Sequence, residues 1–436
     1  NDIFIYLYKN RQNKHIKKKE KIGELLVDKK RIFNNIIISF IIVFVLIAMQ
    51  GCQNINSTPQ NNSKSLNIVI ETKDLEGFEY IEMLLENFKN THKDYQVNIF
   101  NSNDLKNIKD NIINQKYDVI ISSRETFLTL NEYGLIKDLT SYFNQNKSQS
   151  KFYDIVFAYG KVGNKNLGMG LLPNSIEILY NKNKLNNQFA ENDKIDFIKS
   201  MIKNKDFKIP YVLPKDLNIN LAISSIVSNS IIKENNLVSI YNGDKNKYLD
   251  VVDIPNMFKE LSELNNSYKI NEKKFIQSNL DVLNDLNEGE IPLVITTSDV
   301  AKNLSYENIE SLSNLGINNY KATPPILSRY TVCATSSSQN IAGINRFFDY
   351  LISNSTYNDI AQKGILTGNK KADSNLTGLN KVFLTSIAEG NESNIPYFLN
   401  LPKKFMKPLN AKLIEILDYD RYSPNYWKEI VEQVFK

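Results

Sequence analysis

Short apolar runs alternate with amphipathic stretches along the chain beyond its first 65 residues. The runs are rich in β-branched and aromatic residues, which strands favour. Between the runs, apolar residues recur every three or four positions, as at Ile81, Leu84, Leu85 and Phe88, which predicts helices. The expected order is strand 66–71, helix 80–90, strand 95–100, helix 105–114, strand 117–122 and helix 127–133, the last closed by Gly134. This βαβαβ beginning predicts an α/β fold with parallel strands.

A separate apolar run occupies residues 36–49 and follows a basic cluster at 29–31. A basic flank, a short apolar run and a small residue before the cut are typical of a secretory signal, and the run is short for a membrane span. The Gly51-Cys52 pair that follows resembles the lipobox of bacterial lipoproteins, although Met49 and Gln50 depart from the residues preferred there. The resemblance implies cleavage before Cys52 and a lipid such as palmitate on its thiol. The alternative is an uncleaved N-terminal anchor with an incidental cysteine.

Both alternatives place the body of the protein on the extracellular face of the cell membrane, and the lipid-anchored form is the one expected of a Gram-positive lipoprotein. Residues 53–65 are polar and lack aromatics, which predicts a flexible tether after the lipidated cysteine. The first methionine of the sequence is Met49, and a start near Val27 would give a compact leader. Residues 1–25, which we expect not to be translated, are therefore assigned no function.

The charge of the chain is concentrated in this leader. The formal net charge is +5 over 436 residues, but residues 1–31 hold ten Lys or Arg against four acids and so carry +6. Since residues 32–51 are uncharged, the part from Cys52 onward carries 5 − 6 = −1. A nearly neutral body gives no reason to expect a nucleic-acid partner. With Cys52 committed to lipid, Cys333 cannot form an internal disulfide and is expected in the core.

Histidine is too scarce for most catalytic or metal sites. The two histidines are His15, in the leader, and His92, in an expected helix-to-strand connection. The sequence contains no nucleophile elbow, zinc-protease motif, phosphate-binding loop or dinucleotide fingerprint. A glycoside hydrolase with paired carboxylates stays open, but no spacing singles out a pair. We therefore expect no enzyme, no metal and no cofactor.

Several passages resemble extracellular solute-binding proteins of the maltose-binding type (family 1), the lipoprotein components of ABC importers. The passages are 118–123 with 130–140, 170–175 with 179–182, 286–295, and 342–353. The resemblance implies a two-lobed, type II periplasmic-binding-protein-like α/β fold with a ligand cleft between the lobes. By position, 66–169 plus 317–376 would form lobe 1, and 170–316 plus 377–436 would form lobe 2. Ligands of open α/β sheets bind beyond the carboxyl ends of the strands, which independently favours a site at the lobe interface.

Residues directly after the expected strands are the candidate ligand contacts of the first lobe. They are Glu71 and Thr72 at the end of the first strand, and Ser122, Ser123, Arg124 and Glu125 at the end of the third. The alternative for each is an ordinary capping or solvated loop role, since Ser and Thr often cap helices. Sugar-binding relatives often carry an aromatic residue in the second stretch, and it is missing here. Sugar stacking is therefore not expected at this position.

The expected hinge, the second lobe and the segment that returns to the first lobe add six candidates. They are Asn174, Glu177, Ser298, Asp299, Arg329 and Tyr330. Asn174 has the alternative of shaping the turn between the lobes, and Asp299 that of capping a helix, whereas its carboxylate would favour an amine or cation. Arg329 is suited to a carboxylate or phosphate, with a surface salt bridge as the alternative. Tyr330 would stack on a ring, whereas the single tryptophan, Trp427, is expected in the core.

The expected function is that of a monomeric lipoprotein that captures a small solute and delivers it to ABC permease subunits. A sugar or oligosaccharide is the first choice of solute, from the family resemblance alone. One alternative is a sensory or structural lipoprotein of the same fold, and another is an exported glycoside hydrolase. Closure on a solute would be a hinge motion of two rigid lobes.

Overall fold

The computed structural model describes residues 64–72, 77–185, 208–229, 231, 237–268, 274–302, 304, 307–312 and 324–436. All of them belong to one compact unit, residues 63–436. The leader, Cys52 and tether residues 53–63 lie outside the described residues, so cleavage and lipidation at Cys52 stay predictions. The predicted tether end is wrong by one residue, because Ser65 already pairs in the first strand. Within the described residues, no helix is long and apolar enough to cross a membrane.

The first lobe is built on four strands in the order β2-β1-β3-β11. These are β1 (Ser65–Glu71), β2 (Gln96–Ser102), β3 (Val119–Ser122) and β11 (Ile326–Ala334). Strand β1 runs parallel to β2 and β3, whereas β11 is antiparallel to β3. The three predicted N-terminal strands are thus confirmed, with ends shifted by one or two residues.

Helices cover both faces of this sheet, as right-handed crossovers between parallel strands require. The first helices are α2 (Phe78–Thr91), α3 (Leu105–Ile113) and α4 (Arg124–Glu132). The predicted apolar stripe of α2, from Ile81 to Phe88, is buried in the core on one face. Helices α3 and α4 pack on the other face with Cys333, which is fully buried as predicted. Helix α4 begins earlier than expected because Ser123 caps its N-terminus.

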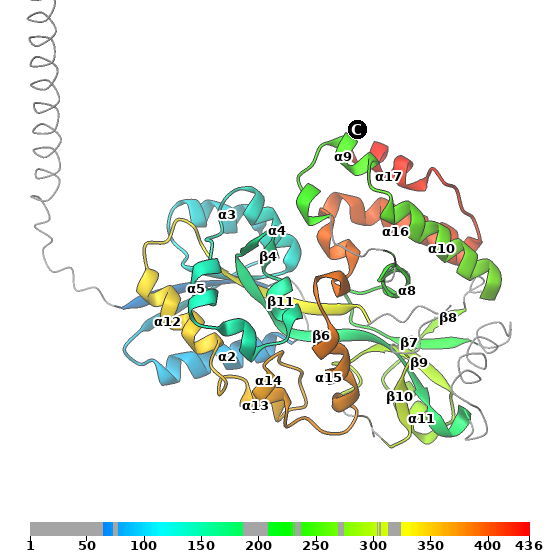
Figure 1. Cartoon of the computed structure of the whole chain (residues 1–436), viewed down its shortest axis with the longest axis horizontal. Coiled ribbons are helices and arrows are strands. Elements are labelled where there is room, and N and C mark those ends of the chain that lie inside the picture. Colours follow the sequence, from blue (N-terminus) through cyan, green and yellow to red (C-terminus); the bar gives the residue numbers. More distant parts are fainter. Residues whose placement is uncertain are drawn as a thin grey trace, which may run out of the picture. The chain divides into compact units, whose positions relative to one another are not determined.

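Strand β6 (Gly168–Asn181) belongs to both lobes. Its first half pairs antiparallel with β11, from Gly168 opposite Cys333 to Ser175 opposite Ile326. Its second half pairs antiparallel with β9 (Leu293–Thr297), from Ile176 onward. Every residue of β6 is buried. The sheet is therefore continuous from one lobe to the other, in the order β2-β1-β3-β11-β6-β9-β7-β8, with β10 also on β6. Figure 1 shows β6 and β11 between the two groups of helices.

The second lobe combines the remaining strands with a helical layer. Its strands are β7 (Ile209–Val212), β8 (Phe275–Gln277), β9 and β10 (Ile309–Ser311). Its helices are α8 (Ile219–Ser228), α9 (Lys245–Leu249), α10 (Asp253–Tyr268), α11 (Asp281–Glu288), α16 (Met406–Tyr419) and α17 (Tyr426–Val434). Trp427 of α17 stacks on Phe405 with ring centres 5.6 Å apart, and its indole N–H donates to the carbonyl of Tyr248. It is a core residue, as predicted.

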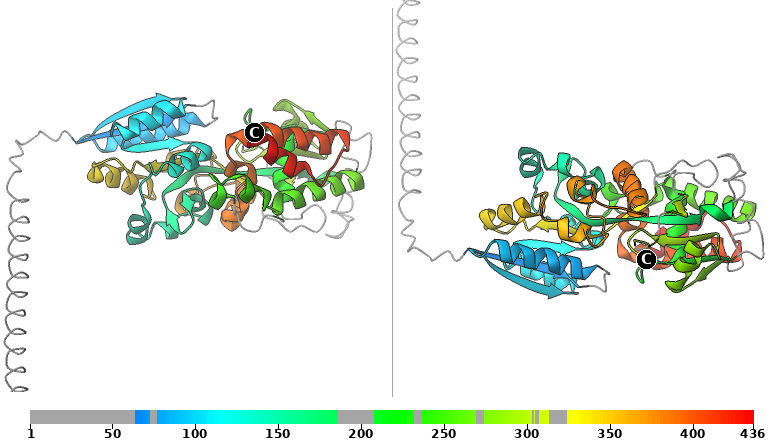
Figure 2. Two further views of the ribbon diagram at one scale, coloured as in Figure 1. Left: turned by 90° about the horizontal axis from the view of Figure 1, so that it is seen from above. Right: turned by 90° about the horizontal axis from the view of Figure 1, so that it is seen from below.

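Shorter elements complete the lobes. They are α5 (Thr140–Gln145), α6 (Asp154–Ala158), β4 (Lys161–Val162), β5 (Lys165–Asn166), α12 (Ile341–Leu351), α13 (Asn358–Ala361), α14 (Lys370–Asp373) and α15 (Asn380–Glu389), with 3-10 turns η1 (Ser148–Lys151), η2 (Lys182–Leu185), η3 (Val238–Ile240), η4 (Glu392–Asn394), η5 (Tyr397–Asn400) and η6 (Lys403–Phe405). Figure 2 shows the elements of the two lobes from two further directions, connected by the shared sheet. The proposed lobe boundaries at 169–170, 316–317 and 376–377 stay a prediction.

Candidate functional site

A cavity of about 480 Å³ lies between the two lobes. Its lining comes from the start of α2, the middle of β6, the segments after β7 and β9, one residue of β11 and the loop after α13. The lining residues are Gly77, Glu79, Tyr80, Leu172, Pro173, Asn174, Val212, Leu213, Lys215, Leu280, Ser298, Asp299, Val300, Lys302, Arg329, Gly364, Ile365 and Leu366. The carboxyl ends of β7 and β9 thus face this cavity, which is where ligands of α/β sheets are expected.

Four of the predicted ligand contacts line this cavity, namely Asn174, Ser298, Asp299 and Arg329. Asn174 lies where β6 passes between the lobes, and its buried Oδ1 atom has no hydrogen-bond partner in the described part of the chain. Ser298 is committed to the sheet, because its hydroxyl accepts from the N–H of Ser175 at 2.9 Å. Buried polar atoms without partners are rare in proteins, so the Asn174 oxygen is a natural acceptor for a ligand hydroxyl.

Asp299 and Arg329 form an ion pair inside the cavity. The Arg329 Nη2 atom donates to Asp299 Oδ2, and only 8% of the arginine and 20% of the aspartate side chain is exposed. The Thr297 hydroxyl donates to the other carboxylate oxygen at 2.5 Å. Sequence reasoning assigned these two charges to opposite ligands, an amine and an anion. In the structure each is compensated by the other, so their ligand-binding roles stay predictions.

Tyr80 and Lys302 both line the cavity and contact each other, and sequence reasoning did not single them out. The Lys302 Nζ atom donates to the Tyr80 hydroxyl at 3.3 Å and lies 5.5 Å from the centre of its ring. Tyr80 belongs to the first turn of α2 in the first lobe, and Lys302 follows β9 in the second. The position of Lys302 shortly after a strand was the available signal for it, whereas Tyr80 lies in a predicted helix. Residues 222 positions apart cannot be paired from one sequence.

Glu71 supports the fold of the first lobe rather than lining the cavity. Both of its buried carboxylate oxygens are occupied: Oε2 accepts from the Ser123 N–H and hydroxyl, and Oε1 from the Thr126 hydroxyl, each at 2.8 Å. These bonds tie the end of β1 to the N-terminus of α4, where a carboxylate is favoured. Thr72 donates its N–H to the Ser102 carbonyl, and Ser122 is fully buried.

Arg124 joins α4 to the second lobe. Its Nε atom donates to Asn400 Oδ1 of η5 at 2.6 Å, and Nη1 donates to the Tyr159 carbonyl at 2.5 Å. The guanidinium is buried, which lowers the pKa of Arg124 to about 10 because the charged form loses hydration. The next residue, Glu125, accepts from the Tyr241 hydroxyl through its backbone carbonyl at 3.3 Å. Neither Arg124 nor Glu125 lines the interlobe cavity.

Glu177 and Tyr330 lie within the sheet. Glu177 is fully buried and accepts from the hydroxyls of Ser175 and Ser311. Tyr330 is also fully buried, and burial raises the pKa of its phenol. Eight predicted contacts are therefore absent from the lining of the interlobe cavity, and their ligand roles stay predictions: Glu71, Thr72, Ser122, Ser123, Arg124, Glu125, Glu177 and Tyr330.

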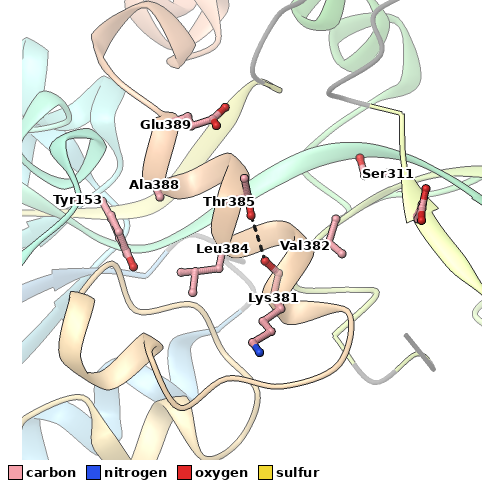
Figure 3. Close-up of a pocket in the computed structure, with 9 residues that line it drawn as sticks. Tyr153, Ser311, Lys381, Val382, Leu384, Thr385, Ala388 and Glu389 are labelled. Atoms are coloured by element: carbon pink, nitrogen blue, oxygen red, sulfur yellow. Dashed lines mark hydrogen bonds between the residues drawn. The ribbon is translucent and has the colours of Figure 1, made fainter. Parts of the chain in front are cut away.

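A larger cavity, of about 750 Å³, lies beside α15. Figure 3 shows Lys381, Thr385 and Glu389 along this helix, with Tyr153 and Ser311 on either side. None of the predicted contacts lines it, and the three helix residues are exposed to solvent. The interlobe cavity is smaller but is the better candidate site. It lies at the ends of β7 and β9, and among the described residues its lining includes the unpaired Oδ1 atom of Asn174. In the described part of the chain, no group of three or more His, Cys, Asp or Glu residues is placed to hold a metal.

The architecture is that of two-lobed extracellular solute-binding proteins, as solved structures of low sequence identity show. A probable secreted solute-binding lipoprotein from Streptomyces coelicolor matches with a TM-score of 0.61 and 10% identity, covering 86% of this chain and 99% of its own. A family 1 extracellular solute-binding protein from Bifidobacterium longum subsp. infantis matches with a TM-score of 0.59 and 13% identity, covering 85% and 98%.

A third similar structure is a cyclo/maltodextrin-binding protein complexed with maltotetraose. It matches with a TM-score of 0.58 and 14% identity, covering 85% of this chain and 96% of its own. No sequence-based family description matches the chain, and no curated protein matches it in sequence. The two-lobed fold predicted from the family resemblance is therefore confirmed by structural similarity.

Proposed function

We propose that this chain is a solute-binding lipoprotein that captures a small extracellular solute and delivers it to the permease of an ABC importer. The observation that carries the proposal is the position of the interlobe cavity. It lies beside β11 and β6, the strand that belongs to both lobes, and at the ends of β7 and β9. A solute in this cavity would contact both lobes. Its binding free energy would then favour one arrangement of the lobes over others, which is the physical basis of hinge closure.

A sugar or oligosaccharide is the solute class that we propose. The fold is shared with a protein solved in complex with maltotetraose, which supports this class. The cavity volume of about 480 Å³ suits a small ligand. Its lining offers an amide, carboxylate and cationic groups for hydroxyls, and the Tyr80 ring as an apolar surface. Asn174, Ser298, Asp299 and Arg329 are the sequence-derived contacts that we retain, and Tyr80 and Lys302 are added to them.

Binding is tested with the purified chain by thermal-shift titration against neutral sugars, acidic sugars, peptides and amines. A specific solute should raise the melting temperature in a concentration-dependent way. Replacing Asn174 by Leu removes the amide and fills part of the cavity, so we expect binding to weaken about tenfold or more. The matched control is Thr385→Leu in the cavity beside α15, which should leave affinity unchanged. An unchanged melting temperature with every class of solute would contradict the solute-binding proposal.

Export and lipid anchoring at Cys52 are the second part of the proposal, supported by the basic flank and apolar run that precede this cysteine. The Cys52→Ser variant should leave the membrane fraction and lose incorporation of labelled palmitate. Equal membrane association of both forms, with no label on the wild type, would contradict lipidation. Delivery is tested separately: the solute-loaded protein should stimulate ATP hydrolysis by permease complexes encoded beside its gene.

A further inference from the structure

We infer that the captured solute carries an anionic group, and that Lys302 is the residue that recognises it. The inference rests on the proposed function and names the substrate class for the same site. The expected solute is a sugar with a carboxylate or phosphate substituent. The cavity offers an acceptor for a hydroxyl and a cation that pairs with no acidic residue among those that the structure describes.

The charged side chains in the interior of the cavity carry a net positive charge. Asp299 is already paired with Arg329, and the side chains of both are largely buried. Glu79 and Lys215 are exposed, so they carry opposite charges at the rim. Lys302 is half-buried, and within the described part of the chain no carboxylate forms an ion pair with its ammonium group. Among the described lining residues, Lys302 therefore leaves one interior positive charge uncompensated.

The neutral partner of Lys302 does not replace an anion. The ammonium group donates to the Tyr80 hydroxyl at 3.3 Å, and its distance of 5.5 Å from the ring centre allows a cation–π interaction. An ammonium group has three donors, so two remain for a ligand. Hydrogen bonds between charged partners are about twice as strong as neutral ones, which favours an anionic acceptor over a hydroxyl.

Two neighbouring features fit a solute that is both anionic and hydroxylated. Gly77 and Glu79, which flank the first residue of α2, line the cavity with Tyr80, and the helix has no side-chain cap. The positive end of its dipole therefore adds to the charge of Lys302. Asn174 also lines the cavity, and its buried Oδ1 atom has no hydrogen-bond partner among the described residues, so a sugar hydroxyl can donate to it.

Matched pairs of solutes test the inference by isothermal titration calorimetry on the full chain. The pairs are galactose with galacturonate, and glucose with glucose 6-phosphate, so that the two arms distinguish a carboxylate from a phosphate. We expect the acidic member of at least one pair to bind about tenfold tighter or more at low salt. The preference should shrink at 0.5 M NaCl, since salt screens partly exposed charges.

The matched variants are Lys302→Met and Lys381→Met, the second in the cavity beside α15. Lys302→Met should abolish the preference for the acidic member, whereas Lys381→Met should retain it, with unchanged circular dichroism in both. Binding of neutral sugars with equal or higher affinity would overturn the inference while leaving the solute-binding proposal intact. Retention of the acidic preference in Lys302→Met would overturn the role of this lysine. Binding of no member, and of no other solute, would overturn both proposals.

Discussion

Variants of Glu71 test whether this residue stabilises the first lobe or contacts the solute. Its position after the first strand predicts a ligand contact, but its carboxylate accepts from Ser123 and Thr126, which both lie at the start of α4. Glu71→Ala removes all three acceptor interactions and leaves the Ser123 N–H without its partner. Hydrogen bonds to a charged group contribute about 1.5–3 kcal/mol each, but they are not additive and the hydroxyls can reorient. We therefore expect a loss of about 3–5 kcal/mol in the free energy of unfolding.

The isosteric variant should cost less. In Glu71→Gln, the amide oxygen can keep the bonds from Ser123, while the amide nitrogen faces the Thr126 hydroxyl, which can also accept. Only the charge of the acceptor is lost, so we expect about 1–2 kcal/mol. The control is Glu125→Gln. Its half-buried carboxylate makes no comparable bonds to other described residues, which contact only its backbone carbonyl.

Urea unfolding followed with two probes measures these losses lobe by lobe. Far-ultraviolet circular dichroism reports both lobes, whereas the fluorescence of the single tryptophan reports the second, in whose core Trp427 is buried. The destabilisation should appear in the circular dichroism transition at least as strongly as in the fluorescence. Solute affinity, measured well below the transition, should change less than about twofold. The reverse result, full stability with lost affinity, would refute the structural assignment and place Glu71 in contact with the solute.

Two further variants test the core and the hinge. Burial raises the pKa of Asp373 to about 6 despite hydrogen bonds from Thr367 and Gly368, so between its ordinary value of 3.8 and about 6 the folded state binds more protons than the unfolded state. Stability should therefore fall as pH rises from 4 to 6.5, by about 3 kcal/mol from this group, and urea titrations of Asp373→Asn should show a correspondingly weaker fall; an unchanged slope would contradict the assignment. In Gly168→Ala the new Cβ atom would lie 2.3 Å from the Val332 carbonyl, which should separate β6 from β11. We expect a loss of more than about 2 kcal/mol in unfolding experiments, against about 1 kcal/mol for Gly163→Ala, which has a positive φ but open space; equal losses would rule out the clash.

Local structure in the first lobe could be predicted well from the sequence. The strands β1 to β3 follow from short apolar runs, and the buried stripe of α2 follows from a spacing of three to four residues. Both patterns reflect neighbours close in the chain. The structure of β6, the strand that belongs to both lobes, could be predicted only in part. Its passage resembles a family hinge, but pairing with β11 on one half and β9 on the other is a long-range property.

The contacts within the candidate site could not be predicted from the sequence alone. The sequence determined the order of the first strands and helices, and it predicts an export signal and candidate contacts at the ends of strands. Only the tertiary structure decided that Glu71 turns toward the capped start of α4, while Asp299 meets Arg329 and Lys302 meets Tyr80. The physical reason is that a carboxylate or ammonium group is satisfied by whichever partner packing brings within about 3 Å. Those partners come from strands and helices far apart in the chain, and no local pattern encodes them.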